Sequence, residues 1–592
     1  MEKLPTVRVN AKGEVDPTAS EADVRKGTAL LEETLHLFRN MRHIHWVLTV
    51  PSVRDVSGKW SGGDLDGGGD GRGLGIAGNC IFVGHQNGAG FKHAINIFKI
   101  QPDPEHDAPV QVGEIPAMFL GNEGFDDREL RSLVYKNAAG EDRYILVRNA
   151  GTNTIGRMET YTIDPQTCLP THKSDEIDFG GQSHEFFLWQ DPKNQKRVLV
   201  YMTNWTSGLP DPDRPGMKTS DLTILAVTDE VTGEPLQKAV TLAGFDLQEV
   251  GGPPVNEKAD ATGLFSDGRF LDYSDNKNLL GRAGNFQNNE QNRLHSLSVL
   301  DDGERAYVAG TTAGFYILNT EFIAQHTNAE LAAGRAGCNG RSTIVSPNGV
   351  IDPAKLTAVA NDCIHMVIND DPGLKAFLAG PASAQAKAER YLVLLTRSRF
   401  DVYPPINATP TGTHSAIFVP NRPAKVKGNT KGRPAYVWLS DENGGCPLNY
   451  ARIMSVESEI VPIMIGAFAI PDNTLEECLT QAILEPNGQR RQQVAQQNHN
   501  PTVFKNLVFN TWYGHGLRVI DISLPMNPRE VGYALPAPQG IARTYPVFKD
   551  GLIYWVDNNT GLHVAKYTGP RADELPGPGT GTYEGNATSP HR

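Results

Sequence analysis

Residues 499–535 read HNPTVFKNLVFNTWYGHGLRVIDISLPMNPREVGYAL. Four short runs rich in β-branched and aromatic residues alternate here with turn signals, at 502–505, 507–512, 517–522 and 530–534. Runs of this length, separated by Gly, Asn and Pro, are typical of antiparallel strands joined by tight turns. The stretch therefore predicts one four-stranded blade of a β-propeller.

The third run of this blade, GLRVIDIS (516–523), is followed by Pro525, Asn527 and Pro528. In these residues the chain resembles the LVIVD-repeat family. The segment TYPVFKDGLIYWVDNNTGLHVAKYTGPRADEL, which starts at Thr544, is similar to the closing segment of large extracytoplasmic bacterial members of that family. The resemblance is strong over the last third of the chain. It implies a propeller that is usually exported, and it does not imply one agreed reaction.

Weaker copies of the blade are found by aligning first strands on the turn that follows each of them. They begin at Arg72, Arg131, His184, His295 and His414, and a last segment begins at Arg543. With the blade at His499 this predicts an all-β, seven-bladed β-propeller. Two long insertions, about 244–291 and 321–412, interrupt the pattern, and a strand-like run at 391–395 keeps an eighth blade as an alternative.

The last segment supplies only three strands, and an incomplete blade would leave an exposed edge. The run IHWVLTV at 44–50 has strand composition, so we expect it to close the ring as the outer strand of blade seven. The predicted organisation is an N-terminal extension over 1–43 with a helix at about 21–40, the propeller over 44–568, and a C-terminal tail over 569–592.

The 592 residues carry 55 Lys and Arg against 68 Asp and Glu, a formal net charge of −13. A nucleic-acid partner needs a concentrated excess of basic residues, so this balance argues against one. No apolar stretch approaches the roughly 20 residues that span a bilayer, which predicts no membrane span. The oligomeric state is not indicated.

Six cysteines occur without a CxxC pair, which disfavours zinc-ribbon and thioredoxin sites. We expect disulfides in an oxidising compartment, and an extracytoplasmic (periplasmic or secreted) protein although the chain shows no signal peptide; scattered reduced core thiols are the alternative. Strand direction in the blades predicts the pairs Cys80 with Cys168 and Cys446 with Cys478. Cys338 and Cys363, which share one insertion, make the remaining pair.

The aligned first strands place one basic or imidazole side chain from each blade in the same register. These residues are Arg72, Arg131, His184, His295, His414, His499 and Arg543. First strands line a propeller channel, so the set should converge at its upper mouth. The four His form a candidate site for a divalent transition metal (Cu, Fe, Zn or Mn), and the three Arg a candidate site for an anion. An anion site without metal, and histidines that only hydrogen-bond to turns, are the alternatives.

Loops after the second strands should share this face. Tyr513, His515 and Glu185 are the candidate acids or bases, and Trp205 and Trp512 could sandwich an organic substrate, with ordinary packing as the alternative for both Trp. The same loops also contain His85, Gln86, Asn204, Asp441 and Glu442, to which no role is assigned. Asp64, Asp66 and Asp70, set among glycines, could form a Ca²⁺ loop, although a flexible turn is favoured because the EF-hand spacing is absent.

The functional hypothesis is a metal-dependent enzyme, an oxidoreductase or a lyase, that acts on a small organic anion at the channel mouth. The alternative is a non-catalytic propeller that binds a protein or a polysaccharide through its upper face.

Overall fold

The structure is a computed structural model of the chain. It describes residues 41–51, 53–54, 60–61, 71–87, 93–118, 125–151, 155–205, 212, 220–245, 294–310, 314–336, 394–398, 413–425, 432–442, 450–459, 462–471, 482–484, 490–492, 497–535, 541–557 and 561–591. The predicted N-terminal helix and the Asp64, Asp66 and Asp70 loop lie outside these residues.

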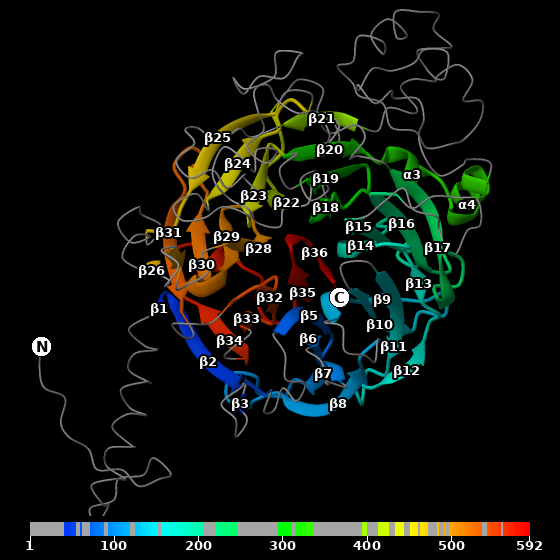
Figure 1. Cartoon of the computed structure of the whole chain (residues 1–592), viewed down its shortest axis with the longest axis horizontal. Helices are drawn as coiled ribbons and strands as arrows, with labels where there is room; N and C mark the ends of the chain where they lie inside the picture. Colours follow the sequence, from blue (N-terminus) through cyan, green and yellow to red (C-terminus); the bar gives the residue numbers. More distant parts are fainter. Residues whose placement is uncertain are drawn as a thin grey trace, which may run out of the picture.

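The strands form seven antiparallel blades arranged in a ring around a central axis (Figure 1), which confirms the predicted seven-bladed propeller. Blade one contains β5 (Gly71–Ala77), β6 (Cys80–Asn87), β7 (His93–Lys99) and β8 (Val110–Pro116). Blade two contains β9 (Phe125–Lys136), β10 (Asp142–Gly151), β11 (Gly156–Ile163) and β12 (Pro170–Lys173), with β13 (Ile177–Asp178) also pairing with β11. Blade three contains β14 (Ser183–Gln190), β15 (Val198–Asn204), β16 (Leu222–Thr228) and β17 (Pro235–Phe245).

Blade four contains β18 (Leu297–Val299), β19 (Arg305–Ala309), β20 (Phe315–Asn319) and β21 (Leu394–Ser398). Blade five contains β22 (Thr413–Phe418), β23 (Tyr436–Asp441), β24 (Ala451–Ser455) and β25 (Ile463–Phe468). Blade six contains β28 (Asn498–Val503), β29 (Leu507–Trp512), β30 (Gly516–Asp521) and β31 (Arg529–Ala534). Blade seven contains β32 (Val547–Lys549), β33 (Leu552–Asp557), β34 (Gly561–Tyr567) and the N-terminal β2 (Ile44–Pro51).

The closing strand lies where the sequence predicts it. β2 pairs antiparallel with β34, from Ile44 opposite Tyr567 to Pro51 opposite Gly561. The preceding β1 (Met41–Arg42) pairs with the outer strand β31 of blade six. The N-terminal segment therefore completes blade seven and also extends blade six.

The alternative of an eighth blade is wrong. The strand-like run near residue 391 belongs to β21, which pairs with β20 as the fourth strand of blade four. The long segment between these strands also contains α3 (Glu321–Gln325) and α4 (Asn328–Ala336), so the second insertion lies within blade four. The first insertion begins later than expected, because β17 continues to Phe245.

The core lies between the blades. Seven hydrophobic clusters are found among the described residues, one between each pair of neighbouring blades around the ring. Strands such as β14 and β15 are buried on both faces, because each blade is covered by its neighbours, and this explains their nearly continuous apolar sequence. Packing on both sides of every blade fixes the inner strands around the channel.

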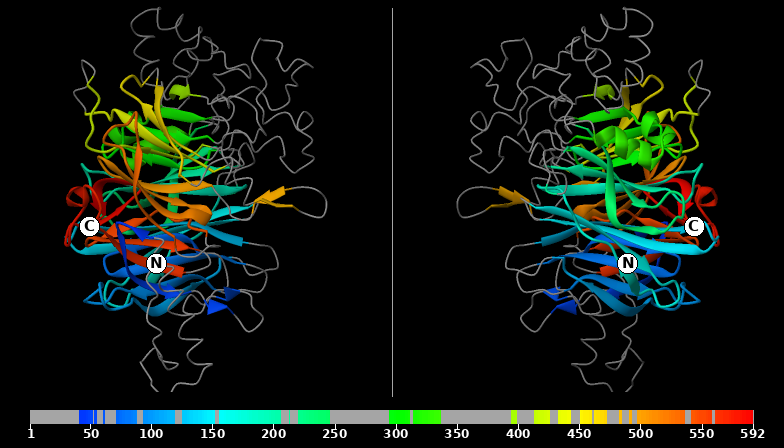
Figure 2. Two further views of the ribbon diagram at one scale, coloured as in Figure 1. Left: turned by 90° about the vertical axis from the view of Figure 1, so that its left-hand side faces the viewer. Right: turned by 90° about the vertical axis from the view of Figure 1, so that its right-hand side faces the viewer.

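The C-terminal segment, expected to be a tail, folds back into the ring. After η3 (Ala572–Glu574), strands β35 (Thr582–Glu584) and β36 (Asn586–His591) form a hairpin near the centre of the ring (Figure 1). β35 pairs with β32, and β36 pairs with β28. Figure 2 shows this segment on the opposite face from the small hairpin of β26 (Ala482–Leu484) and β27 (Arg490–Gln492).

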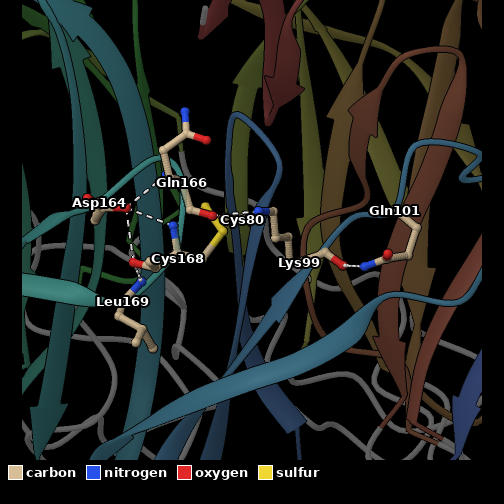
Figure 3. Close-up of a disulfide and its surroundings, with 8 residues drawn as sticks. Cys80, Lys99, Gln101, Asp164, Gln166, Cys168 and Leu169 are labelled. Atoms are coloured by element: carbon tan, nitrogen blue, oxygen red, sulfur yellow. Dashed lines mark hydrogen bonds between the residues drawn. A yellow bond between two sulfur atoms is a disulfide. The ribbon is translucent and has the colours of Figure 1, made fainter.

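A disulfide joins blades one and two (Figure 3). It links Cys80, at the start of β6, to Cys168, with a Cα–Cα distance of 5.3 Å, as the sequence predicts. Cys168 lies in a turn whose first residue, Asp164, accepts hydrogen bonds from the backbone of Gln166 and Thr167. The other four cysteines lie outside the described residues.

Two further findings complete the fold. A short ribbon of β3 (Val53–Arg54) and β4 (Trp60–Ser61) follows the closing strand. Within the described part of the chain, no helix combines the length and apolar character needed to cross a membrane.

Candidate metal centre

The four predicted histidines come from the starts of the inner strands of blades three to six. In blade three, Ser183 faces Asn204 and Phe186 faces Met202, so His184 and Glu185 together occupy the place of a single residue. This arrangement is a β-bulge, which re-aims side chains and is common beside functional sites. It turns the histidine away from the regular alternation of the strand.

The same bulge recurs at the same point in the other blades. In blade five it holds His414 and Ser415, and in blade six His499 and Asn500. In blade four the backbone of Ala309 bonds to both His295 and Ser296, which has the same effect. One local distortion, repeated in four neighbouring blades, thus presents four imidazoles to the channel.

The imidazoles form a continuous buried row. Nε2 of His184 lies 3.0 Å from Nε2 of His295, whose ring centroid is 3.8 Å from that of His414. The His414 and His499 ring centroids are 3.9 Å apart. The predicted convergence of these four side chains is therefore present in the structure.

Two carboxylates complete the cluster. Glu185 Oε1 lies 3.3 Å from Nε2 of His414 and 3.8 Å from Nδ1 of His295. Glu442 follows β23, and its Oε2 lies 3.0 Å from Nε2 of His295 and 3.6 Å from Nε2 of His414. We call His184, Glu185, His295, His414, Glu442 and His499 the His/Glu cluster.

The ligand atoms of the His/Glu cluster are close enough to share a cation. They form three overlapping groups in which all atoms lie within 4.8 Å of one another: His184, Glu185 and His295; Glu185, His414 and His499; His295, His414 and Glu442. Two ligands at right angles on a metal with bonds of about 2.1 Å are about 3.0 Å apart. The shortest contacts of His295 have this length.

Hydrogen bonds alone do not satisfy the cluster. Nε2 of His295 lies 3.0 Å from both His184 Nε2 and Glu442 Oε2, and it can carry only one proton. Nδ1 of His295 and Oε2 of Glu185 are buried without a hydrogen-bond partner, and Nε2 of His414 is buried with carboxylate oxygens of Glu185 and Glu442 at 3.3 and 3.6 Å. Buried polar atoms are normally paired, and a cation held between these ligand atoms could supply the pairing.

Electrostatics favour the ligand-competent forms of four cluster residues, whereas His414 is shifted toward its protonated form and must lose that proton to bind a metal. Burial, and then the charge of His414, lower the pKa of His295 and hold that of His499 well below its usual range. Burial opposes charge on Glu185, but His414 and the other imidazoles lower its pKa to about 2, and that of Glu442 is also held low. Glu185 and Glu442 in turn raise the pKa of His414. Two neutral imidazoles and two carboxylates are thus ready to bind a dication.

Second-strand side chains and backbone groups hold the histidines in place. Nδ1–H of His499 donates to the carbonyl of Arg543 at 2.6 Å, which fixes the tautomer and leaves Nε2 unprotonated. Thr203 of β15 contacts the carbonyls of Glu185 and His295, at 2.8 and 2.6 Å. Hydrogen bonds of this kind orient metal ligands in proteins.

Aromatic residues lie at both ends of the histidine row. Trp205 stacks on His184, with centroids 3.8 Å apart, and is partly exposed. Tyr513 packs against His499, and its hydroxyl donates to Glu442. The guanidinium of Arg543 lies 5.0 Å from the centre of the Tyr513 ring. Three of the predicted residues therefore border the cluster.

Other predicted residues lie elsewhere. Trp512 is fully buried in the cluster between blades five and six, which supports the packing alternative rather than a substrate contact. His515 is buried in η2 (Tyr513–His515), where its carbonyl accepts a hydrogen bond from Arg518. Arg72 lies in a bulge of β5, and its side chain is outside the described residues.

The predicted register of Arg131 is wrong. In blade two the backbone of Glu129 bonds to Asn149, as that of Glu185 bonds to Thr203 in blade three. Arg128, which precedes Glu129, is therefore the equivalent of His184. Arg131 lies three residues further along β9, where it is 3% exposed and pairs with buried carboxylates instead of bordering the channel mouth.

Comparisons with known proteins show no family for the chain. No family model matches the chain, and no curated protein is similar to it. Among solved structures, the chain is similar to the β-propeller domain of Cps50 (Swd1) from Myceliophteria thermophila, with 7% identity, a TM-score of 0.38, and coverage of 89% of this chain and 100% of that one. It is also similar to Sqt1 from Chaetomium thermophilum, with 9% identity, a TM-score of 0.38, and coverage of 85% and 97%. Similarities this low carry no argument about function.

Proposed function

We propose that the His/Glu cluster binds a divalent transition metal and that the propeller uses it to oxidise or cleave a small organic anion. The observation that carries this proposal is the convergence of six ligand side chains, five of them buried and Glu442 partly exposed, two of which have an atom without a hydrogen-bond partner. The two carboxylates supply the charge that a dication neutralises. Imidazole ligands suit Cu, Fe and Zn, and carboxylates extend the set to Mn.

The surroundings of the cluster support an organic anion as the substrate. Arg543 is partly exposed as a residue and brings its guanidinium to the edge of the cluster, with Nε and Nη1 buried there. Guanidinium groups bind carboxylates and phosphates well. Trp205 and Tyr513 offer aromatic surface at the two ends of the histidine row. When bound, the metal would supply Lewis-acid or redox chemistry.

The chain's own residues would position the substrate and move its protons. In this proposal Arg543 binds the anionic group and Trp205 packs against the carbon skeleton. Tyr513, hydrogen-bonded to Glu442, is the residue placed to exchange a proton with the substrate. The LVIVD-repeat resemblance and the Cys80–Cys168 disulfide both support an extracytoplasmic location for this chemistry.

Metal analysis of the purified protein tests the proposal. We expect near-stoichiometric Cu, Fe, Zn or Mn after dialysis, and its loss in the double variant His295→Ala, His499→Ala. The matched control is His563→Gln, which changes a buried histidine of β34 outside the cluster and should keep the metal. Absence of metal in the wild-type protein, after metal has also been offered to it, would favour the non-catalytic propeller that binds a protein or polysaccharide.

A further inference from the structure

A second group of charged residues lies deeper in the propeller than the His/Glu cluster. Arg131 Nε is 3.5 Å from Glu129 Oε1, and Arg131 Nη1 is 3.3 Å from Glu584 Oε1. The three side chains are 4, 5 and 3% exposed. Glu129 and Arg131 belong to β9, whereas Glu584 ends β35 of the C-terminal hairpin. We call these three residues the Glu–Arg–Glu triad.

The surroundings of the triad exclude solvent. Arg131 Nε donates to the carbonyl of Phe186 at 2.7 Å, and its guanidinium lies 4.4 Å from the centre of the Tyr545 ring. The Tyr545 hydroxyl in turn shares a hydrogen bond of 2.6 Å with Ser296. On the β28 side, the Thr502 hydroxyl accepts a hydrogen bond from the backbone of Gly585, next to Glu584.

The charges of the triad do not balance. Arg131 carries one positive charge at any physiological pH, and the two carboxylates together carry two negative charges when ionised. An uncompensated buried charge is costly, and such groups usually bind a proton instead. Burial accordingly raises the pKa of Glu584 to about 7 and that of Glu129 well above its ordinary value. Among the described residues, Arg131 faces both carboxyls, and Glu185 and the titratable Tyr545 interact with Glu129.

Glu185 connects the triad electrostatically to the His/Glu cluster. It occupies in blade three the place that Glu129 occupies in blade two, as their matching hydrogen bonds to Asn149 and Thr203 show. Its negative charge raises the pKa of Glu129 and stabilises the Arg131 cation. A dication bound beside Glu185 would offset that negative charge and so lower the proton affinity of the triad carboxyls.

We propose that the Glu–Arg–Glu triad binds one proton and releases it when a divalent metal ion fills the His/Glu cluster. The release depends on the proposed function of the cluster, whereas the bound proton follows from the triad alone. The C-terminal hairpin then has a chemical role, because it contributes one of the two carboxyls that share the proton. Metal binding would therefore release a proton from residues that are not themselves metal ligands.

Infrared spectroscopy of the metal-free protein tests the bound proton. We expect the carbonyl band of a protonated carboxylic acid near neutral pH in the wild-type protein. Glu584→Gln and Glu129→Gln should each remove it, since either change leaves one carboxylate opposite Arg131. Glu530→Gln is the matched control, because Glu530 forms a buried one-to-one pair with Arg518 in blade six. If the band is absent, or survives both triad variants, the proton-binding site is wrong.

Calorimetric titration with Zn²⁺, in buffers of different ionisation enthalpy, tests the linkage. Near pH 7 each triad variant should release roughly one proton fewer per Zn²⁺ than the wild type, whereas Glu530→Gln should match it. Equal proton release in all four proteins, with Zn²⁺ bound, would overturn the linkage and leave the metal site standing. If the wild type binds neither Zn²⁺ nor Cu²⁺, Fe²⁺ or Mn²⁺ in the same titration, the proposed function and the linkage both fail. The infrared band alone then decides whether the triad holds a proton.

Discussion

Thr203 shows how a residue that is not a ligand can control the metal centre. Its hydroxyl contacts the carbonyls of Glu185 and His295 and accepts a hydrogen bond from the backbone of Glu185. Since both of these residues belong to the His/Glu cluster, one hydroxyl fixes the backbone beneath ligands from two blades. Its removal should therefore affect metal binding more than folding.

We expect Thr203→Val to weaken Zn²⁺ binding about tenfold, the lower end of the range typical of residues that orient metal ligands. Titration calorimetry measures the effect. Thr228→Val is the control, because Thr228 makes the same kind of buried hydrogen bonds in the same blade, with Lys196 and Val198. Equal affinities in the two variants would show that Thr203 has no special role.

His563 should make the protein sensitive to acid. Burial lowers its pKa from 6.5 to about 3, so it is neutral in the folded protein and binds a proton more readily when unfolded. Above pH 6.5, His563 is neutral in both states and does not reduce the free energy of unfolding. Below pH 6.5, proton binding to the unfolded state lowers the free energy of unfolding by up to about 1.4 kcal/mol per pH unit, until the pH reaches about 3. In His563→Gln, the free energy of unfolding should depend less on pH over this window. An unchanged slope in urea unfolding series would contradict the assignment.

At the scale of turns and strands, blades two and three contain the same type of turn, which ends on a cysteine in blade two and on a glycine in blade three. Asp164 and Asp229 each accept hydrogen bonds from the second and third residues after them. Gly233 has φ +75° in blade three, and Cys168 has φ +63° at the same place in blade two. A cysteine thus occupies a left-handed position that favours glycine, where it can reach Cys80.

Loss of this disulfide should destabilise the protein. It spans 88 residues, for which the chain-entropy model gives about 4 to 5 kcal/mol. We expect the double variant Cys80→Ser, Cys168→Gly to unfold at a lower denaturant concentration than the oxidised wild type. Glycine at position 168 should offset part of the loss, because it adopts the left-handed backbone conformation of Cys168 without the strain that a side chain causes there. Cys80→Ser, Cys168→Ser should therefore be less stable still, and the reverse order would contradict the shared turn.

The sequence predicts the histidine row well because each His precedes the turn of its blade by a similar number of residues. The same alignment fails at Arg131, since β9 runs on to Lys136, eight residues beyond Arg128, whereas β22 and β28 end four residues after their histidines. The sequence identifies Glu442 only as a loop residue. Its role in the cluster cannot be predicted, because its contact with His295 depends on how two blades pack.

For the molecule as a whole, the ring depends on the pairing of β2 with β34. Deleting residues 1–51 should leave the edge of β34 exposed, so the protein should aggregate or lose cooperative melting. Deleting residues 1–40 is the control, since it keeps both β1 and β2. Scanning calorimetry and light scattering distinguish the two. If both truncated proteins melt like the full chain, β2 does not hold the ring together.

The pairing of β2 with β34 also sets an order of events during synthesis. About 500 residues separate Pro51 from its partner Gly561, so a ribosome that adds 5–20 residues per second needs roughly half a minute to two minutes between them. During that time β2 has no partner, and the ring stays open. The ring can therefore close only after nearly the whole chain has been synthesised.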